Sequence, residues 1–168
     1  MDRDGMAVPA ANGQAKGTIR LGELLAADRV IAGLRARDKP ALIQELAARA
    51  AKLLGLAVPA IAGPLMEREQ MGSTGLGRGF ALPHARVPGL PRCFGLFARL
   101  ARPVEYQAID EQPVDLVFVL LIPPDADTAH VAALAAISRR MRDPGLLERL
   151  RKSDSAGELY RLIVDDPE

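Results

Sequence analysis

A nine-residue run, residues 114–122, constrains the fold of this chain more than any other segment. Eight of its nine residues are apolar, and three valines and one isoleucine among them favour extended backbone. Pro123 and Pro124 follow directly and end the segment, because proline cannot donate to a strand ladder. A nearly continuous apolar strand is typical of burial on both faces. We therefore expect this strand to be central in a sheet covered by helices on both sides.

The length of the chain, 168 residues, fits one domain that can bury a core without disulfides or metals. Residues 1–18 are rich in Gly, Ala, Asp and Lys and show no sustained apolar period. Such a segment cannot offset its ordering entropy by burial. The sequence therefore predicts a disordered leader over residues 1–18 and a single domain over residues 19–168.

The charges are balanced, with 22 basic and 21 acidic residues and a formal net charge of +1. This balance gives no overall attraction to nucleic acid or to an anionic membrane. No run of about eighteen apolar residues is present, and the first residues lack the apolar stretch of a secretory signal. The lone Cys93 fits a reducing compartment. We expect a cytoplasmic protein that neither binds nucleic acid nor inserts directly into a membrane.

Helical patterns precede and follow the apolar strand. One helix is predicted from Pro40 to Leu54, with Asp38 as a capping residue before it and Gly55 at its end. Another is predicted over residues 59–70, with Gly63 and Pro64 delaying its start or kinking it. Further helices are expected at 128–141, 144–151 and 156–163, and further strands at 30–34, 80–82 and 93–100. The expected fold class is α/β, a mixed β-sheet flanked by helices on both faces.

A compact loop with four glycines, residues 71–79, comes before His84, one of only two histidines. Pro83 limits the backbone ahead of the imidazole, and His84 is expected between a strand and an exposed turn. From this position alone, a surface or hydrogen-bonded structural histidine is a more common explanation than a functional one.

Two stretches change that balance, Arg68-Glu-Gln-Met-Gly-Ser-Thr74 and Gly77-Arg-Gly-Phe-Ala-Leu-Pro-His84. Together they resemble the active-site signature of the enzyme IIA fructose/mannitol/nitrogen-regulatory family of phosphotransferase systems. An Arg-Glu pair, a Ser-Thr step, a Gly-x-Gly step and Ala-aliphatic-Pro-His all occur with matching spacing. The resemblance covers roughly residues 20–165, and Gly72-Ser-Thr-Gly-Leu-Gly77 is closest to the nitrogen-regulatory branch.

This resemblance implies an enzyme IIA mannitol-type fold and a single phosphotransferase-system EIIA type-2 domain over residues 19–168. It implies that His84 accepts a phosphoryl group from a histidine phosphocarrier protein, without a cofactor. In the nitrogen-regulatory branch the phosphorylation state then regulates target proteins, such as kinases or potassium transporters. A sugar-transport role, in which phosphate passes from His84 to a IIB domain, stays open, as does a binding module that is not phosphorylated.

The chemistry of the residues agrees with a carrier. A neutral imidazole is nucleophilic near pH 7, and phosphoryl transfer needs mainly in-line positioning and stabilisation of oxygen charge. Arg68 is the candidate for that stabilisation, although a surface ion pair also explains it. By resemblance, His130 is expected close to His84. The candidates for phosphate binding are Ser73, Thr74, Gly77 and Gly79, for which turn formation is the alternative.

Three departures from the family pattern are visible, and we expect them to affect partner choice. Arg78 stands where the family often has Asn, Phe80 where it usually has Val or Ile, and Val131-Ala132 where Leu-Lys often follows the second histidine.

Other site types fit poorly. The glycine loop lacks the Gly-Lys-Ser/Thr ending of a P-loop and the strand-loop-helix context of a dinucleotide site. Two histidines and one cysteine, without a metalloprotease helix or paired cysteines, argue against a metal centre.

Overall fold

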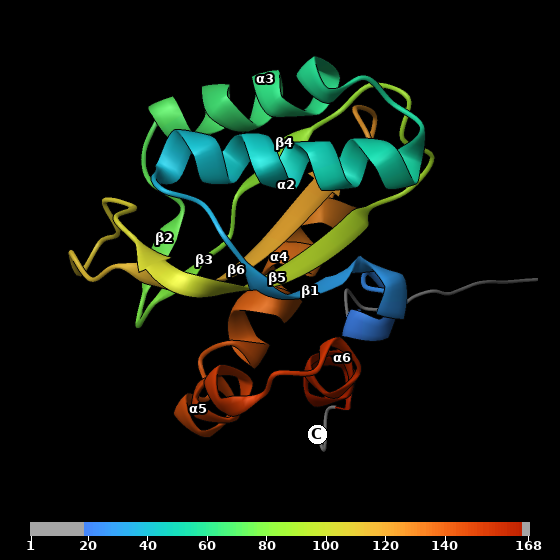
Figure 1. Ribbon diagram of the computed structural model, residues 1–168. Coiled ribbons are helices and arrows are strands. Elements are labelled where there is room, and N and C mark those ends of the chain that lie inside the picture. The colour runs from blue at the N-terminus through green and yellow to red at the C-terminus, as the bar shows by residue number, and fades with distance from the viewer. Residues whose placement is uncertain (1–18, 166–168) are drawn as a thin grey trace, which may run out of the picture.

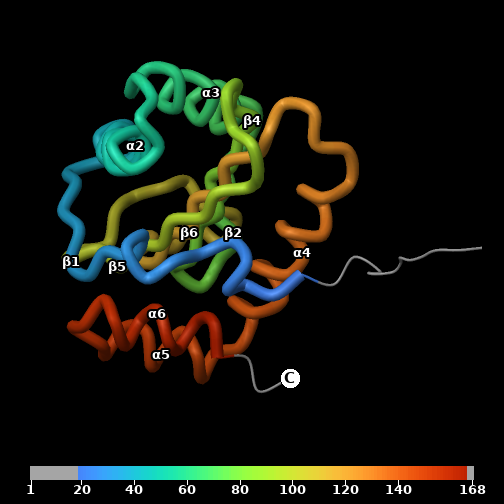
Figure 2. The backbone as a smooth tube through the Cα atoms, turned by 90° about the vertical axis from the view of Figure 1, so that its right-hand side faces the viewer, coloured from blue at the N-terminus to red at the C-terminus, as the bar shows by residue number. Residues whose placement is uncertain are grey.

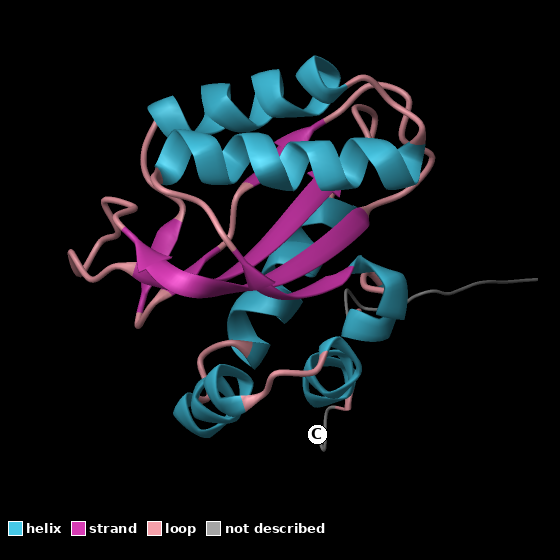
Figure 3. Cartoon of the chain, in the orientation of Figure 1, coloured by secondary structure: helices cyan, strands magenta, loops and turns pink. Residues whose placement is uncertain are grey.

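The computed structural model describes residues 19–165, which form three layers with the sheet in the middle (Figures 1 and 3). The predicted leader, residues 1–18, lies outside the described residues. Helices α2 and α3 cover one face of the sheet, and α4, α5 and α6 lie on the other, as the side view also shows (Figure 2). The predicted α/β fold, a mixed sheet flanked by helices on both faces, is confirmed.

The elements are η2 (Leu21–Glu23), η3 (Ala27–Arg29), β1 (Val30–Leu34), α2 (Lys39–Leu54), α3 (Val58–Gln70), β2 (Gly75–Gly77), β3 (Phe80–Ala81), β4 (His84–Arg86), β5 (Phe94–Val104), β6 (Val114–Ile122), α4 (Ala129–Arg140), α5 (Pro144–Lys152) and α6 (Ala156–Val164).

Strand β6 has the bounds that the apolar run predicts, and it lies inside the sheet. The strand order is β1-β5-β6-β3-β2, and β4 also pairs with β6. β6 runs antiparallel to β5 and parallel to both β3 and β4. All its residues except Asp115 are buried, so the expectation of a central strand covered on both faces is confirmed.

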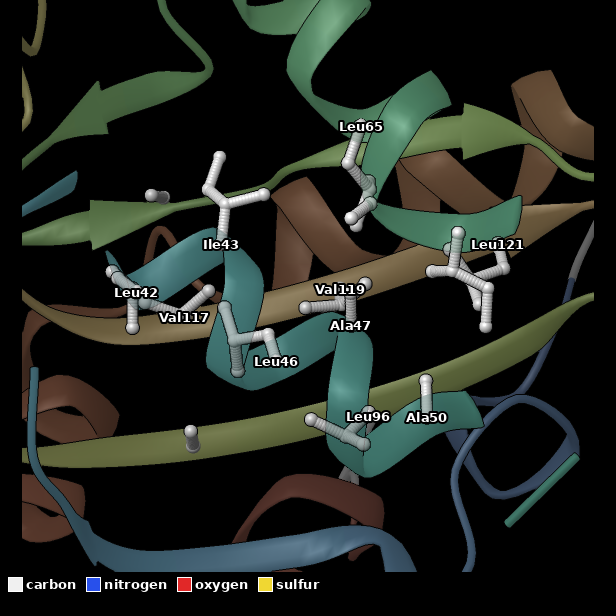
Figure 4. Close-up of a cluster of buried hydrophobic side chains, with 14 of the residues drawn as sticks. Leu42, Ile43, Leu46, Ala47, Ala50, Leu65, Leu96, Val117, Val119 and Leu121 are labelled. Atoms are coloured by element: carbon white, nitrogen blue, oxygen red, sulfur yellow. The ribbon is translucent and has the colours of Figure 1, made fainter. Parts of the chain in front are cut away.

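Alternate residues of β6 build two separate cores, because successive side chains of a strand point to opposite faces. Val117, Val119 and Leu121 pack with the apolar face of α2 and α3, as Figure 4 shows. Leu116, Phe118 and Leu120 pack with α4, α5 and α6. Helices therefore pack against both faces of the sheet.

The caps of α2 follow the sequence prediction. The Asp38 carboxylate accepts a hydrogen bond from the backbone N–H of Ala41 at 2.9 Å, Pro40 lies in the first turn, and Gly55 ends the helix with a φ of 71°. Helix α3 differs from its prediction, because it begins earlier, at Val58, and passes through Gly63 and Pro64 without a break in its assignment. Burial of its apolar face compensates for the one hydrogen bond that Pro64 cannot make.

Two short strands, β2 and β4, were not predicted. β2 lies within the glycine loop, and β4 contains His84, which the sequence placed between a strand and a turn. Both β3 and β4 run parallel along β6, with Phe80 opposite Leu116 and His84 opposite Leu120. Pro83 interrupts this row because it has no N–H, and its carbonyl accepts the N–H of Leu120 at 3.0 Å. β4 therefore continues the line of β3 after a short break.

Candidate functional site

His84 is half-buried at the first position of β4. Its neighbour Ala85 belongs to the core under α2 and α3, so His84 and Arg86 point toward the opposite face, where α4 lies. The backbone of this segment is tied to the central strand β6, with His84 opposite Leu120. The imidazole is thus carried by a paired strand and not by a free turn.

The Leu82 carbonyl fixes the tautomer of His84. Nδ1 of His84 lies 2.8 Å from the backbone oxygen of Leu82, which can only accept a hydrogen bond. Nδ1 therefore carries the hydrogen, and in the neutral ring Nε2 keeps its lone pair. This arrangement makes Nε2 the nucleophilic atom.

Burial lowers the pKa of His84 below its ordinary value of 6.5 and is the largest influence on it. The hydrogen bond to Leu82 raises this pKa, as does the charge of Glu69, whereas the charges of Arg68 and His130 lower it. The net lowering favours the neutral ring at pH 7, which is the form that can attack phosphorus. Arg68 and His130, both predicted as site residues, are among the groups that act on this pKa.

Arg68 lies in the last turn of α3, in the helical layer above the sheet. Its Nη1 donates to the carbonyl of Gly72 at 2.9 Å, which holds the guanidinium over the beginning of the glycine loop. The charge of Arg68 lowers the pKa of His84, and its role in phosphoryl transfer stays a prediction.

His130 comes from the other helical layer, at the second position of α4. Its Nδ1 is buried and has no hydrogen-bond partner among residues 19–165. A buried N–H without an acceptor costs more than a buried lone pair, so the favoured neutral tautomer carries its hydrogen on Nε2. In this tautomer the ring presents a donor.

Arg86 is a residue of the site region that the sequence reasoning missed. Its Nη1 donates to the carbonyls of Pro123 at 3.2 Å, Pro124 at 3.0 Å and Ala126 at 3.0 Å. These carbonyls belong to the loop that leads from β6 into α4, and so toward His130. The available signal was a cation two residues after His84 on one strand face, near a Pro-Pro step rich in carbonyl acceptors.

The hydroxyls of Ser73 and Thr74 are engaged within the protein. Ser73 Oγ donates to the Tyr106 carbonyl at 3.0 Å and accepts the N–H of Gly75 at 3.1 Å. The Thr74 hydroxyl is buried against the Glu69 carboxylate and lies 3.0 Å from the Tyr106 hydroxyl. Phosphate binding by these two residues stays a prediction, and the structure gives both hydroxyls partners of their own.

Gly77 and Gly79 flank the turn between β2 and β3, with φ values of 104° and 78° that favour glycine. The Gly79 carbonyl accepts the N–H of Leu116, near the beginning of β6. Leu120, opposite His84, lies four residues further, or about 13 Å along the strand. The structure thus does not bring Gly79 beside His84, and phosphate binding by Gly77 stays a prediction.

Arg78 adopts a left-handed conformation with a φ of 57°. Its N–H donates to the Asp110 carboxylate at 2.9 Å, and its Nη1 donates to the Arg142 carbonyl at 2.8 Å. The side chain thereby ties the β2–β3 turn to the segment after α4.

No metal centre is formed within residues 19–165, where no three His, Cys, Asp or Glu side chains are grouped to hold an ion. The same residues contain no helix that is long and apolar enough to cross a membrane.

Comparisons with known proteins agree with the geometry. The family model described as "Phosphoenolpyruvate-dependent sugar phosphotransferase system, EIIA 2" matches residues 23–166. A "Nitrogen regulatory protein" of Bradyrhizobium diazoefficiens is 42% identical over 145 residues, which cover 86% of this chain and 95% of the relative. The crystal structure of Nitrogen Regulatory Protein IIA-Ntr from Neisseria meningitidis superposes with a TM-score of 0.80 at 31% identity, covering 85% of this chain and 98% of that one. IIA mannitol from Escherichia coli, at 21% identity, shares the fold with a TM-score of 0.70, covering 83% of this chain and 98% of that one.

Proposed function

Because this chain belongs to the EIIA 2 family of the phosphoenolpyruvate-dependent sugar phosphotransferase system, we propose that it carries a phosphoryl group on Nε2 of His84. The observation that carries the proposal is the hydrogen bond from Nδ1 of His84 to the Leu82 carbonyl at 2.8 Å. It leaves one ring nitrogen as nucleophile, on a ring whose pKa is lowered so that it is neutral at pH 7.

The donor is a phosphorylated histidine of a phosphocarrier protein. As the new P–N bond to Nε2 of His84 forms, the P–N bond of the donor breaks, and the donor imidazole leaves with that electron pair. The transition state is loose, so the protein has to align the two rings and stabilise negative charge on the phosphoryl oxygens. Arg68 supplies positive charge from α3, and His130 supplies a donor from α4. Ser73, Thr74 and Gly77 remain proposed phosphate contacts, whereas Gly79, about 13 Å further along β6, is not proposed as one. No cofactor is required.

We further propose a regulatory role in the cytoplasm, in which the phosphorylation state of His84 controls the binding of target proteins such as kinases or potassium transporters. The names of relatives that cover nearly the whole chain support this role, since they are nitrogen regulatory proteins. Passing phosphate to a IIB domain of sugar transport is the second candidate, and it uses the same site.

The test is phosphorylation with phosphoenolpyruvate, enzyme I and the histidine phosphocarrier of the same organism, followed by intact mass spectrometry. We expect an acid-labile phosphoryl adduct on the wild-type protein and none on His84→Ala. His130→Ala is the matched variant, because it removes the other histidine and should slow labelling without moving its position. Equal labelling of His84→Ala, or no adduct with a demonstrably charged donor, would overturn the assignment. Addition of a IIB domain separates the two candidates, since only the sugar-transport role expects rapid discharge to it.

A further inference from the structure

A buried ion pair lies behind the site, between the first residue of α2 and the last turn of α3. Nζ of Lys39 is 2.9 Å from the carboxylate of Glu69, whose residue is only 8% exposed. Lys39 also donates to the Tyr106 carbonyl at 3.1 Å and lies 4.2 Å from the centre of the Tyr106 ring. A buried pair of this kind requires further hydrogen bonds to compensate for its desolvation.

The carboxylate of Glu69 receives those bonds from two other residues. The backbone N–H of Thr74 donates to it at 3.2 Å, the Thr74 hydroxyl also contacts it, and the Tyr106 hydroxyl donates at 3.0 Å. Burial, together with the charge of Glu69, raises the pKa of Tyr106, so its hydroxyl stays protonated and acts as a donor. Together with Lys39, these donors occupy the acceptor sites of the carboxylate and fix Thr74 against the end of α3.

Thr74 connects this cluster to the nucleophile through the backbone N–H and C=O of a single residue, Leu82. Its carbonyl accepts the N–H of Leu82 at 2.9 Å, and the Leu82 carbonyl in turn accepts Nδ1–H of His84 at 2.8 Å. A continuous line of polar contacts therefore runs from Lys39 through Glu69, Thr74 and Leu82 to the imidazole.

We propose that Lys39 and Glu69 are positioning residues for phosphoryl transfer. By fixing Thr74, the pair holds the Leu82 carbonyl at the place where it selects the tautomer and orientation of His84. The proposal rests on the proposed phosphoryl transfer to His84. Neither side chain touches the phosphoryl group, so their effect falls on the maximal transfer rate and not on the affinity for the donor.

The experiment compares Glu69→Gln, Lys39→Met and the double variant, with Glu45→Gln as control. Glu45 forms an exposed ion pair with Arg49 on α2, at 3.1 Å. Transfer rates from the phosphorylated phosphocarrier are measured at saturating donor and divided by the folded fraction, which circular dichroism gives.

We expect the maximal rate of each single variant to decrease about tenfold or more at an unchanged apparent KM, because small misplacements of reacting groups lower the rate strongly. The double variant leaves no unpaired buried charge and should be faster than either single variant. The control should match the wild type.

A purely structural pair would lower the folded fraction and leave the rate per folded molecule unchanged, and that result would overturn the proposal. A double variant slower than both single variants would also overturn the proposal.

Exchange of the Nδ1 hydrogen of His84, followed by NMR, provides a readout that needs no phosphoryl transfer. We expect faster exchange in Glu69→Gln than in the wild type, and equal exchange would contradict the proposal. If the wild type takes no label, the proposed function fails, and the exchange rates alone decide whether the pair positions the ring.

Discussion

Leu82 and His84 lie two residues apart, and the carbonyl oxygen of Leu82 is 2.8 Å from Nδ1 of His84. Because a carbonyl cannot donate, this contact leaves only Nε2 free to bond to phosphorus. We predict that the phosphorylated protein carries the Nε2 isomer of phosphohistidine alone. The ¹⁵N shifts of the labelled ring distinguish the two isomers. A Nδ1 adduct would contradict the geometry.

The second prediction concerns pH. Burial lowers the pKa of His84 below 6.5, so the ring of the folded protein should titrate below this value, whereas in the unfolded chain it titrates near it. In this window the unfolded state binds more protons, and the free energy of unfolding therefore decreases as the pH falls through it. The phosphorylation rate should persist to a lower pH than an ordinary histidine allows.

An NMR titration of the His84 ring, repeated in urea, checks the shift. A midpoint at or above 6.5 in the folded protein would show that burial does not dominate the ring.

The third prediction concerns the loop before α4. Arg86 donates to three carbonyls there, two of them from prolines. Arg86→Met keeps the long apolar stem but removes these bonds, so the loop should open more often. We expect the amide of Ala126, which bonds to the Pro123 carbonyl, to exchange several-fold faster. Hydrogen exchange by NMR measures this, and Arg102→Met, at an exposed position of β5, should leave the rate unchanged.

The fourth prediction concerns the fold. A Cβ at Gly95 would lie 2.7 Å from the Leu24 carbonyl and 2.8 Å from the Phe118 ring. Gly95→Ala should therefore lower the free energy of unfolding by about 1–3 kcal/mol through overpacking. Gly63→Ala is the matched control, since a Cβ in the middle of α3 has no contact within 4 Å and should stabilise the protein by about 0.5–1 kcal/mol. Urea unfolding measures both, and equal effects would contradict the packing argument.

The fifth prediction concerns partners. Phosphorylation of His84 adds a doubly charged group at a half-buried surface position. We expect it to change the affinity for a regulatory target by about 5–150-fold, the range typical of coupling between sites. Isothermal titration of both forms measures the change, and equal affinities would remove the regulatory part of the proposal.

Local signals explain which parts of the fold could be predicted. β6 was predicted with its full bounds because burial on both faces leaves an uninterrupted apolar pattern, and α2 because Asp38 and Gly55 mark its ends. β2 and β4 are too short to carry a pattern. β2 is defined by its pairing with the adjacent β3, and β4 by its pairing with the distant β6.

For the candidate site too, some residues have a local sequence signal and others do not. The motif around His84 points to Arg68 and His130, both of which lower the pKa of the imidazole, and their roles in phosphoryl transfer stay predictions. Arg86 and the pair of Lys39 with Glu69 depend on contacts between residues 30 or more positions apart, for which the sequence has no local signal.

The pairing of β2 with β3 ends at Thr74 and Leu82. The Leu82 N–H donates to the Thr74 carbonyl, but the Thr74 N–H donates to Glu69 and not back to Leu82, so the Leu82 carbonyl is free to accept from the imidazole. Many catalytic histidines are oriented by a carboxylate, which also stabilises the charged ring. A backbone carbonyl orients the ring without adding a charge, so its basicity is set mainly by burial. An irregularity in the sheet thus takes the place of an acidic side chain.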